Sequence, residues 1–142
     1  FGSYRGTPVF RNAANCQKEQ NMPLVTISIL KGKTPEYIKA VADGINSAVI
    51  ETMGFPDDDR YQIIHQLDPE CLQLQTRDGD RVMMHLVMRA GRSNKAKQAF
   101  YRKVVENLSQ NPGIKPANVL VTITENHDID WSFRDGVAQF VV

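Results

Sequence analysis

Two successive strand–helix–strand patterns, over residues 24–67 and 81–124, constrain the fold of this 142-residue chain more than any other feature. In each pattern a stretch rich in β-branched residues is followed by a segment with apolar residues at three- and four-residue steps, and then by a second extended stretch. Parallel strands joined through a helix form right-handed crossovers, so both units fit into one sheet with their helices on the same face. We therefore predict an α+β fold in which two βαβ units form a four-stranded mixed sheet with two helices on one face.

The first unit has well-marked boundaries. Its strands are predicted over residues 24–30 and 61–67, where apolar and polar residues alternate. Between them Thr34 supplies a helix N-cap and Pro35 a first-turn proline, and the helix is predicted to run to Met53, just before Gly54.

The second unit is bounded in the same way. Strands are predicted over residues 81–89 and 118–124, and a helix follows Ser93 as its N-cap and stops at residues 111–113. A minor extended segment is predicted over residues 71–75. Residues 82–88 are apolar in both alternation sets, which indicates a strand buried on both faces. His65 and His85 lie within apolar strands, and such histidines are typical of a core.

One face of the predicted sheet carries no helix. Because that face is also apolar, we expect it to be covered by another copy of the chain in a symmetric oligomer.

Charge and hydropathy narrow the classes of partner. The formal charge is +1, and residues 1–22 carry +2 of it, which leaves −1 on residues 23–142. A nearly neutral body argues against nucleic-acid binding, and the longest apolar stretches are too short to span a membrane. With Cys16 in the first segment and Cys71 in the second, residues 23–142 have no internal disulfide pair, and we expect a cytoplasmic protein. We interpret residues 1–22 as a leader, added in cloning or outside the mature protein, and residues 23–142 as a single domain.

The first predicted strand directly follows Met22 and Pro23. If translation begins at Met22 and this residue is removed, Pro23 carries a free secondary amine; if the leader stays attached, the same nitrogen is a tertiary amide without a basic lone pair. An amine in an apolar pocket has its pKa lowered towards neutrality, where it serves as both acid and base.

Several motifs in order along residues 23–142 resemble the tautomerase superfamily, and most closely its malonate semialdehyde decarboxylase subgroup. They are Pro23-Leu24, Asp59-Arg60-Tyr61-Gln62, the loop from Arg89 to Arg92 with Ser93, Gln98-Ala99-Phe100-Tyr101, Trp131-Ser132-Phe133, and Ala138-Gln139-Phe140. Members of this superfamily use an N-terminal proline as acid or base.

The resemblance implies a role for each matching residue. Pro23, Asp59 and Arg92 would be catalytic, as the amine, the carboxylate that orients water or substrate, and a charge-stabilising guanidinium. Arg89 would bind the substrate carboxylate together with Arg92, since two guanidinium forks can clamp it bidentately. The hydrophobic pocket wall would consist of Trp131, Phe133 and Phe140, with Tyr61 and Gln62 as further candidates.

The arginine spacing departs from the subgroup. Decarboxylases carry Arg-Pro-Arg, whereas this chain has two residues, Ala90 and Gly91, between Arg89 and Arg92. That spacing is similar to the cis-3-chloroacrylic acid dehalogenase subgroup, but the first-helix histidine and the late tyrosine and glutamate of that subgroup are missing. Whether the two arginines converge on one carboxylate is therefore left open by the sequence.

The resemblance implies a cofactor-independent enzyme that decarboxylates or hydrates a small 3-oxo or unsaturated carboxylic acid, and that assembles as a homotrimer. No metal or organic cofactor is expected, because the substrate's own carbonyl accepts the electrons. One alternative is keto–enol tautomerisation of an α-keto acid such as phenylpyruvate. The other is a non-catalytic βαβ-repeat binding module, if Pro23 is blocked.

Overall fold

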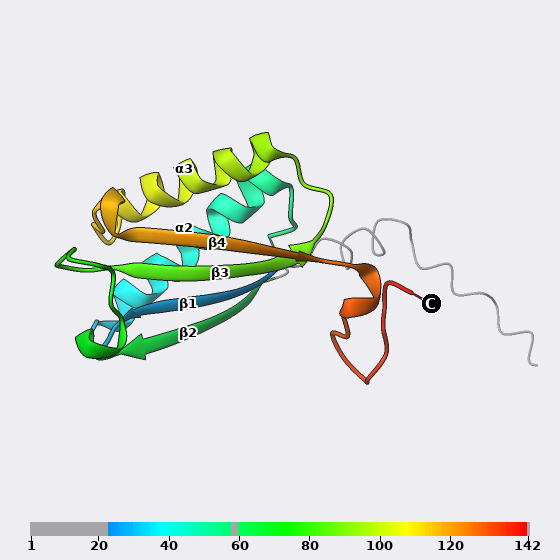
Figure 1. Ribbon diagram of the computed structural model, residues 1–142, viewed down its shortest axis with the longest axis horizontal. Helices are drawn as coiled ribbons and strands as arrows, with labels where there is room; N and C mark the ends of the chain where they lie inside the picture. Colours follow the sequence, from blue (N-terminus) through cyan, green and yellow to red (C-terminus); the bar gives the residue numbers. More distant parts are fainter. Residues whose placement is uncertain (1–22, 58–59, 142) are drawn as a thin grey trace, which may run out of the picture.

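The computed structural model describes residues 23–57 and 60–141, and its centre is a four-stranded sheet in the order β2-β1-β3-β4. The strands are β1 (Leu24–Leu30), β2 (Tyr61–Leu67), β3 (Val82–Arg89) and β4 (Val119–Asn126). The pairs β1–β2 and β3–β4 are parallel, whereas the central pair β1–β3 is antiparallel. Both long helices lie on the same face of the sheet (Figure 1). The predicted mixed sheet of two βαβ units is confirmed.

The helices begin and end where the sequence predicts. Helix α2 (Pro35–Met53) is capped by Thr34, whose hydroxyl accepts a hydrogen bond from the Tyr37 backbone N–H at 3.1 Å. It ends at Gly54, which adopts the left-handed conformation with φ 70° that residues with a side chain rarely adopt. Helix α3 (Asn94–Gln110) is capped by Ser93, whose hydroxyl accepts a hydrogen bond from a backbone N–H in the first turn, as the Thr34 hydroxyl does in α2.

The two helices approach each other closely at Gly44. A Cβ atom at this position would lie 3.2 Å from Cδ2 of Leu108 in α3. The carbonyl of Gly44 also accepts a hydrogen bond from Asn107 Nδ2 at 2.9 Å. Even an alanine at position 44 would require the Leu108 side chain to shift slightly, so this glycine permits the close approach of the two helices.

The core lies between the helical layer and the sheet. In β1 and β3 every second side chain is buried against the helices, as a strand with one covered face requires. The fully buried side chains that form this layer include Ile27, Ile29, Ile45, Met84, Leu86, Met88, Phe100 and Leu108.

The segment between β2 and β3 differs from the prediction. Instead of an extended stretch over residues 71–75, the chain forms a short 3-10 helix, η1 (Pro69–Cys71), followed by turns. Leu72 and Leu74 are both 3% exposed, and Gln75 has a φ of 56°. Burial of the two leucines therefore bends the chain where their alternation suggested a strand. Two further 3-10 helices, η2 (Pro116–Asn118) and η3 (Asp128–Asp130), flank β4.

The sheet face opposite the helices is open in the described chain. The second alternation set of β3 is only half-buried, so the prediction that this strand is buried on both faces is wrong for a single copy. The prediction of core histidines is also wrong, because His65 is exposed and His85 is half-exposed on this face. His85 Nε2 lies 2.8 Å from the Thr124 hydroxyl. Because both alternation sets of β3 are largely apolar, its sequence does not indicate which set faces the core.

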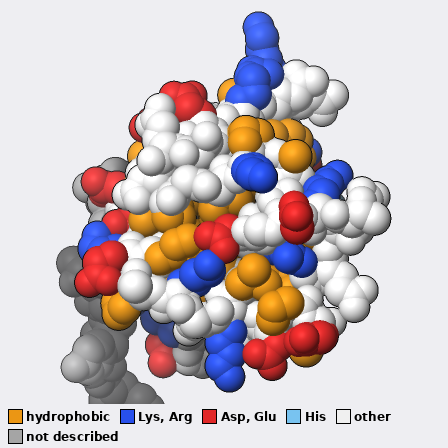
Figure 2. All heavy atoms as spheres, turned by 90° about the vertical axis from the view of Figure 1, so that its left-hand side faces the viewer, with side chains coloured by type: hydrophobic (Ala, Val, Ile, Leu, Met, Phe, Trp, Pro, Cys, Tyr) orange, Lys and Arg blue, Asp and Glu red, His pale blue; other side chains and the backbone are white. Residues whose placement is uncertain are grey.

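The end of the sheet where β1 and β2 finish carries charges of both signs. Figure 2 shows basic and acidic side chains intermixed with hydrophobic ones over this end. Lys33, for example, pairs with Asp80 at 2.5 Å. No helix in the described ranges is both long and apolar enough to cross a membrane.

Because Phe100 is fully buried between α3 and the sheet, Phe100→Ala should lower the free energy of unfolding by about 3–5 kcal/mol. Chemical denaturation followed by circular dichroism measures this loss. Tyr101→Ala is the matched control, since this neighbouring aromatic residue is 37% exposed and should cost much less. Equal losses for the two variants would contradict the assignment of Phe100 to the core.

Candidate active site

The candidate site lies at the end of the sheet where β1 and β2 begin and β3 and β4 end, which we call the strand edge (Figure 1). Leu24 pairs with Val87 across the antiparallel strands, so Pro23 lies level with the last residues of β3. Arg89 in turn pairs with Asn126 at the end of β4. Pro23 is buried. The sheet register therefore brings the proline, the first arginine and the end of β4 to one place.

Arg89 and Arg92 are close enough to influence each other. Arg89 ends β3, and the chain turns through Gly91, which has a φ of 129°, before Arg92 and helix α3. Burial lowers the pKa of Arg92 below its ordinary value, and the charge of Arg89 lowers this pKa further. The charges of Arg89 and Arg92 therefore still interact, although the loop between them is one residue longer than Arg-Pro-Arg.

Arg92 lies over an aromatic ring that the sequence did not single out. Its guanidinium carbon is 4.6 Å from the centre of the Phe55 ring, in the segment that follows α2. A guanidinium stacked in this way is held in place by a cation–π interaction.

Arg89 is held from two directions by the chain that follows β4. Its Nε lies 2.6 Å from Asp128 Oδ1 in an ion pair, and its guanidinium carbon lies 4.9 Å from the centre of the Phe140 ring. The Arg89 side chain is 28% exposed and that of Asp128 46% exposed, so solvent still reaches the pair.

The three predicted wall residues form one aromatic cluster. Trp131 and Phe133 stack with ring centres 5.1 Å apart, and Phe140 meets Phe133 edge-on at 5.3 Å. Tyr61 at the start of β2 contacts the same Phe133 ring at 5.8 Å. The cluster thereby connects the C-terminal segment to the sheet.

Gln139 fixes the loop that carries this cluster. Its Oε1 accepts from the Phe133 backbone N–H at 2.9 Å, and its Nε2 donates to the Arg134 carbonyl at 2.8 Å. The ring positions are therefore set by hydrogen bonds as well as by packing.

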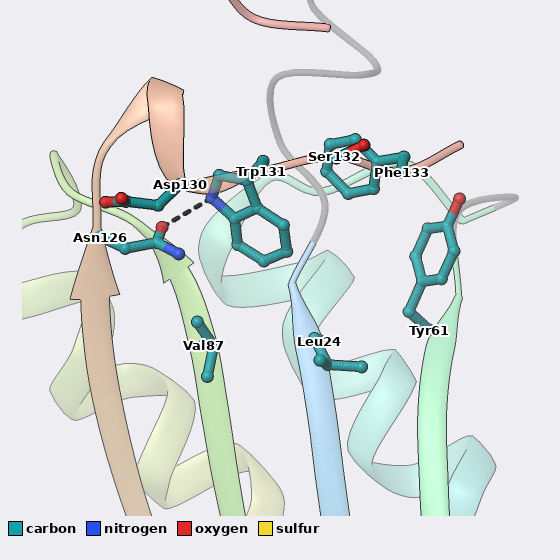
Figure 3. A pocket seen from close by; sticks show the side chains of 8 residues that line it. All are labelled: Leu24, Tyr61, Val87, Asn126, Asp130, Trp131, Ser132 and Phe133. Atoms are coloured by element: carbon teal, nitrogen blue, oxygen red, sulfur yellow. Dashed lines mark hydrogen bonds between the residues drawn. The ribbon is translucent and has the colours of Figure 1, made fainter. Parts of the chain in front are cut away.

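A cavity of about 360 Å³ lies between the cluster and the strand ends (Figure 3). Apolar and aromatic side chains dominate its wall, with a few polar groups among them. The lining residues are Leu24, Tyr61, Val87, Asn126, Asp130, Trp131, Ser132 and Phe133. In Figure 3 the Trp131 indole N–H points to Asn126, whose Oδ1 accepts its hydrogen bond at 2.6 Å.

The structure gathers most of the predicted residues at this edge. Pro23, Arg89, Trp131, Phe133 and Phe140 lie around it, and the charge of Arg89 acts on Arg92.

The structure contradicts one candidate, Gln62, and leaves another, Asp59, undescribed. Asp59 and the leader predicted over residues 1–22 lie outside the described residues. Gln62 points the other way, because its Nε2 donates to the Ala42 carbonyl in α2 at 2.9 Å, and the prediction that it lines the site is wrong.

Sequence reasoning missed Asn126, Asp128 and Phe55. Only the position of the first two at the end of β4 could have been inferred, because polar residues at the end of a strand lie beside the end of its parallel neighbour; their contacts could not. Within the described ranges, no group of three or more His, Cys, Asp or Glu side chains could hold a metal ion.

Comparison with known proteins points to one family. Two sequence profiles that describe tautomerase enzymes match the chain, one over residues 23–76 and the other over residues 59–134. A curated relative, a probable tautomerase named YrdN from Bacillus subtilis (strain 168), is 31% identical over 126 residues, which cover 84% of this chain and 97% of the relative.

Two solved structures share both fold and sequence with this chain. One is malonate semialdehyde decarboxylase, described with its decarboxylase and hydratase activities and with a variant whose proline at position one is replaced by alanine. It is 33% identical, with a TM-score of 0.76, over 83% of this chain and 95% of that one. The other is FG41 malonate semialdehyde decarboxylase inhibited by 3-bromopropiolate, 31% identical, with a TM-score of 0.78, over 83% of this chain and 94% of that one.

We predict that Asn126→Leu releases the Trp131 ring, because it removes the oxygen that accepts the indole hydrogen bond. Trp131 is the only tryptophan in the chain, so its near-ultraviolet circular dichroism and emission maximum report the change directly. The near-ultraviolet band should weaken, and stability should fall by about 1 kcal/mol. Asn126→Asp keeps an oxygen acceptor and should retain the signal. An unchanged spectrum in Asn126→Leu would contradict this role.

Proposed function

Because this chain belongs to the tautomerase enzyme family, we propose that residues 23–142 form a cofactor-independent enzyme that decarboxylates or hydrates a small 3-oxo or unsaturated carboxylic acid. The proposal names Pro23 as the catalytic amine and Arg89 and Arg92 as the carboxylate clamp. Its main support is that Arg89 ends β3 close to the level of the buried Pro23, and that Arg92 is near enough to Arg89 for that charge to lower its pKa.

The proposal requires a free Pro23 nitrogen in the working enzyme. A peptide bond to Met22 would make this nitrogen an amide, which neither donates nor accepts a proton at neutral pH. Two observations support a free amine: one family match begins at residue 23, and the similar decarboxylase was studied with its proline at position one replaced.

In the decarboxylation reaction, protonated Pro23 hydrogen-bonds to the carbonyl oxygen of the 3-oxo acid. The bond between the carboxylate carbon and C2 breaks, and its electron pair forms the C2–C3 double bond of an enol as the oxygen takes the proton from Pro23. Carbon dioxide leaves, and the enol then gains a proton at C2 from solvent while its oxygen returns a proton to Pro23, which regenerates the protonated amine and the carbonyl. No external electron acceptor is needed, because the carbonyl takes the electron pair.

Arg89 and Arg92 would hold the carboxylate during this step. Two like charges at a half-buried site raise each other's energy, and a bound anion relieves that repulsion. Both guanidinium groups also stack on aromatic rings, which fixes the planes of their donors.

The hydration reaction requires a base for water, and we assign this role to Asp59 on the sequence motif alone. Asp59 would take a proton from water as the oxygen adds to the unsaturated acid. Protonated Pro23 would supply the proton that the neighbouring carbon gains.

Keto–enol tautomerisation of an α-keto acid is the second candidate. The cavity of about 360 Å³ is larger than a three-carbon acid needs, and Trp131, Phe133 and Tyr61 would accommodate a flat ring such as that of phenylpyruvate. The Bacillus subtilis relative also carries the name probable tautomerase. Neutral Pro23 would then move a proton between the enol oxygen and carbon 3.

We predict that Pro23→Ala, in protein expressed from Met22 so that this methionine is removed, lowers kcat/KM at least about 100-fold, as loss of an acid–base group does. Turnover is measured with malonate semialdehyde, an unsaturated three-carbon acid and phenylenolpyruvate. The first two test decarboxylation and hydration, and the third tests tautomerisation.

Pro35→Ala is the matched control, since Pro35 occupies the first turn of α2 away from the site and should leave turnover unchanged. The form that retains residues 1–22 should resemble Pro23→Ala in activity. Wild-type turnover in Pro23→Ala would refute the proline mechanism.

We also propose that the open sheet face forms the interface of a homotrimer. Large apolar side chains remain exposed on it, among them Tyr61 at 40%, Ile63 at 47% and Leu120 at 37%. Such a concentration on one face is typical of a protein–protein contact. We expect this assembly to act on its small carboxylate substrate in the cytoplasm, without nucleic-acid or membrane partners.

Replacing both Ile63 and Leu120 by Lys should dissociate the oligomer, because two buried cations per copy would have no counter-charge at the interface. Analytical ultracentrifugation should show trimers for the wild type and monomers for the variant. Tyr101→Lys changes a residue that is also 37% exposed, but on the helical layer, and should leave the trimer intact. A variant that still sediments as the wild type would exclude this face as the interface.

A further inference from the structure

The side-chain amide of Asn126, at the end of β4, has one atom bound to the protein and one that is not. Its Oδ1 accepts the hydrogen bond of the Trp131 indole at 2.6 Å. Because an indole N–H can only donate, the amide atom that faces it is the oxygen, and the NH2 group lies on the other branch. The orientation of this amide is therefore fixed by its partner.

The NH2 group of Asn126 opens onto the cavity. Asn126 is one of the lining residues, and Figure 3 shows its nitrogen on the side that faces Val87 and the Trp131 ring. Within the described ranges, no protein atom accepts a hydrogen bond from this nitrogen. It also remains accessible to solvent, since it is not one of the buried polar atoms without a partner. Its N–H donors are therefore available to a molecule in the cavity.

The surroundings of this donor are apolar. Val87 and the Trp131 ring lie beside it, and Leu24 lies on the strand next to β3. A donor that loses its water in such surroundings without gaining an acceptor costs free energy. A ligand that displaces this water therefore binds more tightly if it places an oxygen there than if it places a methylene group.

The strands fix where the donor stands relative to Arg89. Asn126 pairs with Arg89 in the parallel register of β3 and β4. The Asn126 carbonyl accepts from the Ala90 backbone N–H at 2.9 Å, which ties the two strand ends together. Neighbouring strands lie about 4.8 Å apart. This separation suits a small acid whose second oxygen lies one or two carbons from its carboxylate.

Two other lining residues carry neutral donors, but they lie elsewhere. The hydroxyl groups of Tyr61 and Ser132 are on the side of Phe133, away from Asn126 (Figure 3). Asp130 is an acceptor, and its Oδ2 already accepts from the His127 backbone N–H at 2.9 Å. The amide of Asn126 is thus the neutral donor at the Trp131 end of the cavity.

We propose that Asn126 is a substrate-binding residue that donates a hydrogen bond from Nδ2 to the oxo oxygen of an oxo acid. It would thereby select such acids over acids that lack this oxygen. The inference rests on the proposed function, in which Arg89 and Arg92 hold the carboxylate. Trp131 orients the amide, and the amide binds the oxo group.

A purely structural role for Asn126 predicts a different result. If the amide only anchored Trp131, a variant that keeps the oxygen acceptor would retain the wild-type preference among acids. Asn126→Asp is that variant, because it keeps an acceptor for the indole N–H and replaces the NH2 group by a second oxygen. Its charge weakens the binding of every anion. The informative quantity is therefore the ratio of two dissociation constants, which removes this general repulsion.

The test uses two pairs of acids that differ only in one oxo group. Benzoylformate and phenylacetate carry C=O and CH2, respectively, next to the carboxylate. Monomethyl malonate and 3-methoxypropanoate differ in the same way one carbon further along. Isothermal titration calorimetry on the full 142-residue chain measures the four dissociation constants.

We expect the wild type to bind the oxo member of one pair about 10-fold more tightly than its partner, a difference of about 1.4 kcal/mol. The pair that shows this preference places the oxo group at C2 or at C3. In Asn126→Asp the ratio should fall to about one or below, while the near-ultraviolet signal of Trp131 is retained. If this variant does not fold, Asn126→Leu, which also lacks the donor, should give a ratio of about one.

Three control variants separate Asn126 from its surroundings. Ser132→Ala and Tyr61→Phe remove the other two neutral donors of the lining and should keep the wild-type ratio. Glu51→Ala removes an ion pair with Lys103 between the helices and should leave all four dissociation constants unchanged.

Equal wild-type affinities within both pairs would overturn the inference, as would a wild type that binds none of the four acids. The same holds if the preference persists in Asn126→Asp, or if it disappears in Ser132→Ala or Tyr61→Phe instead.

Turnover with Pro23 free judges the proposed function separately. Benzoylformate has no hydrogen on the carbons next to its oxo group, so it cannot enolise, and its binding does not depend on the reaction. Turnover without an oxo preference would refute the role of Asn126 alone. An Asn126-dependent preference without turnover would support that role and refute the proposed reaction.

Discussion

The antiparallel pairing of β1 with β3 is the contact on which the rest of this structure depends. Each βαβ unit alone would leave both edges of its two-stranded sheet unpaired, and the β1–β3 pair joins the inner edge of each unit in one register. The same register sets Pro23 beside the end of β3, where Arg89 begins the loop to Arg92. A shift of one residue would turn Leu24 and Val87 from the open face towards the helices. Core and site are thus specified by a single strand alignment.

Local signals in the sequence were sufficient for most of the fold. Thr34 and Ser93 mark both helix starts, and Gly54 marks the end of α2, because capping is a short-range interaction visible in neighbouring residues. The failures have a common cause. The histidines of β2 and β3 were assigned to the core, and residues 71–75 were assigned to an extended segment. In both cases an apolar pattern showed that residues are buried, but not which part of the chain they are buried against.

The site was predictable only where its residues carry a motif. Arg89, Trp131 and Phe133 match family patterns and lie together at the strand edge. Asn126 and Asp128 match none, because their roles depend on the path of η3, which returns the chain over the ends of β3 and β4. No spacing rule in one sequence encodes a contact that exists only after such a turn has formed. The Arg89–Arg92 loop is similar: the sequence shows its length, and the structure shows that both charges act on the same region.

Leu24, Tyr61 and Val87 line the cavity and also belong to the open face of the sheet. A mutation at any of these positions would therefore change both the cavity wall and the face that we propose as the trimer interface. Residues 130–133, in contrast, shape the cavity from a connecting segment outside the sheet. A substitution in that segment could therefore reshape the cavity without altering the open face of the sheet.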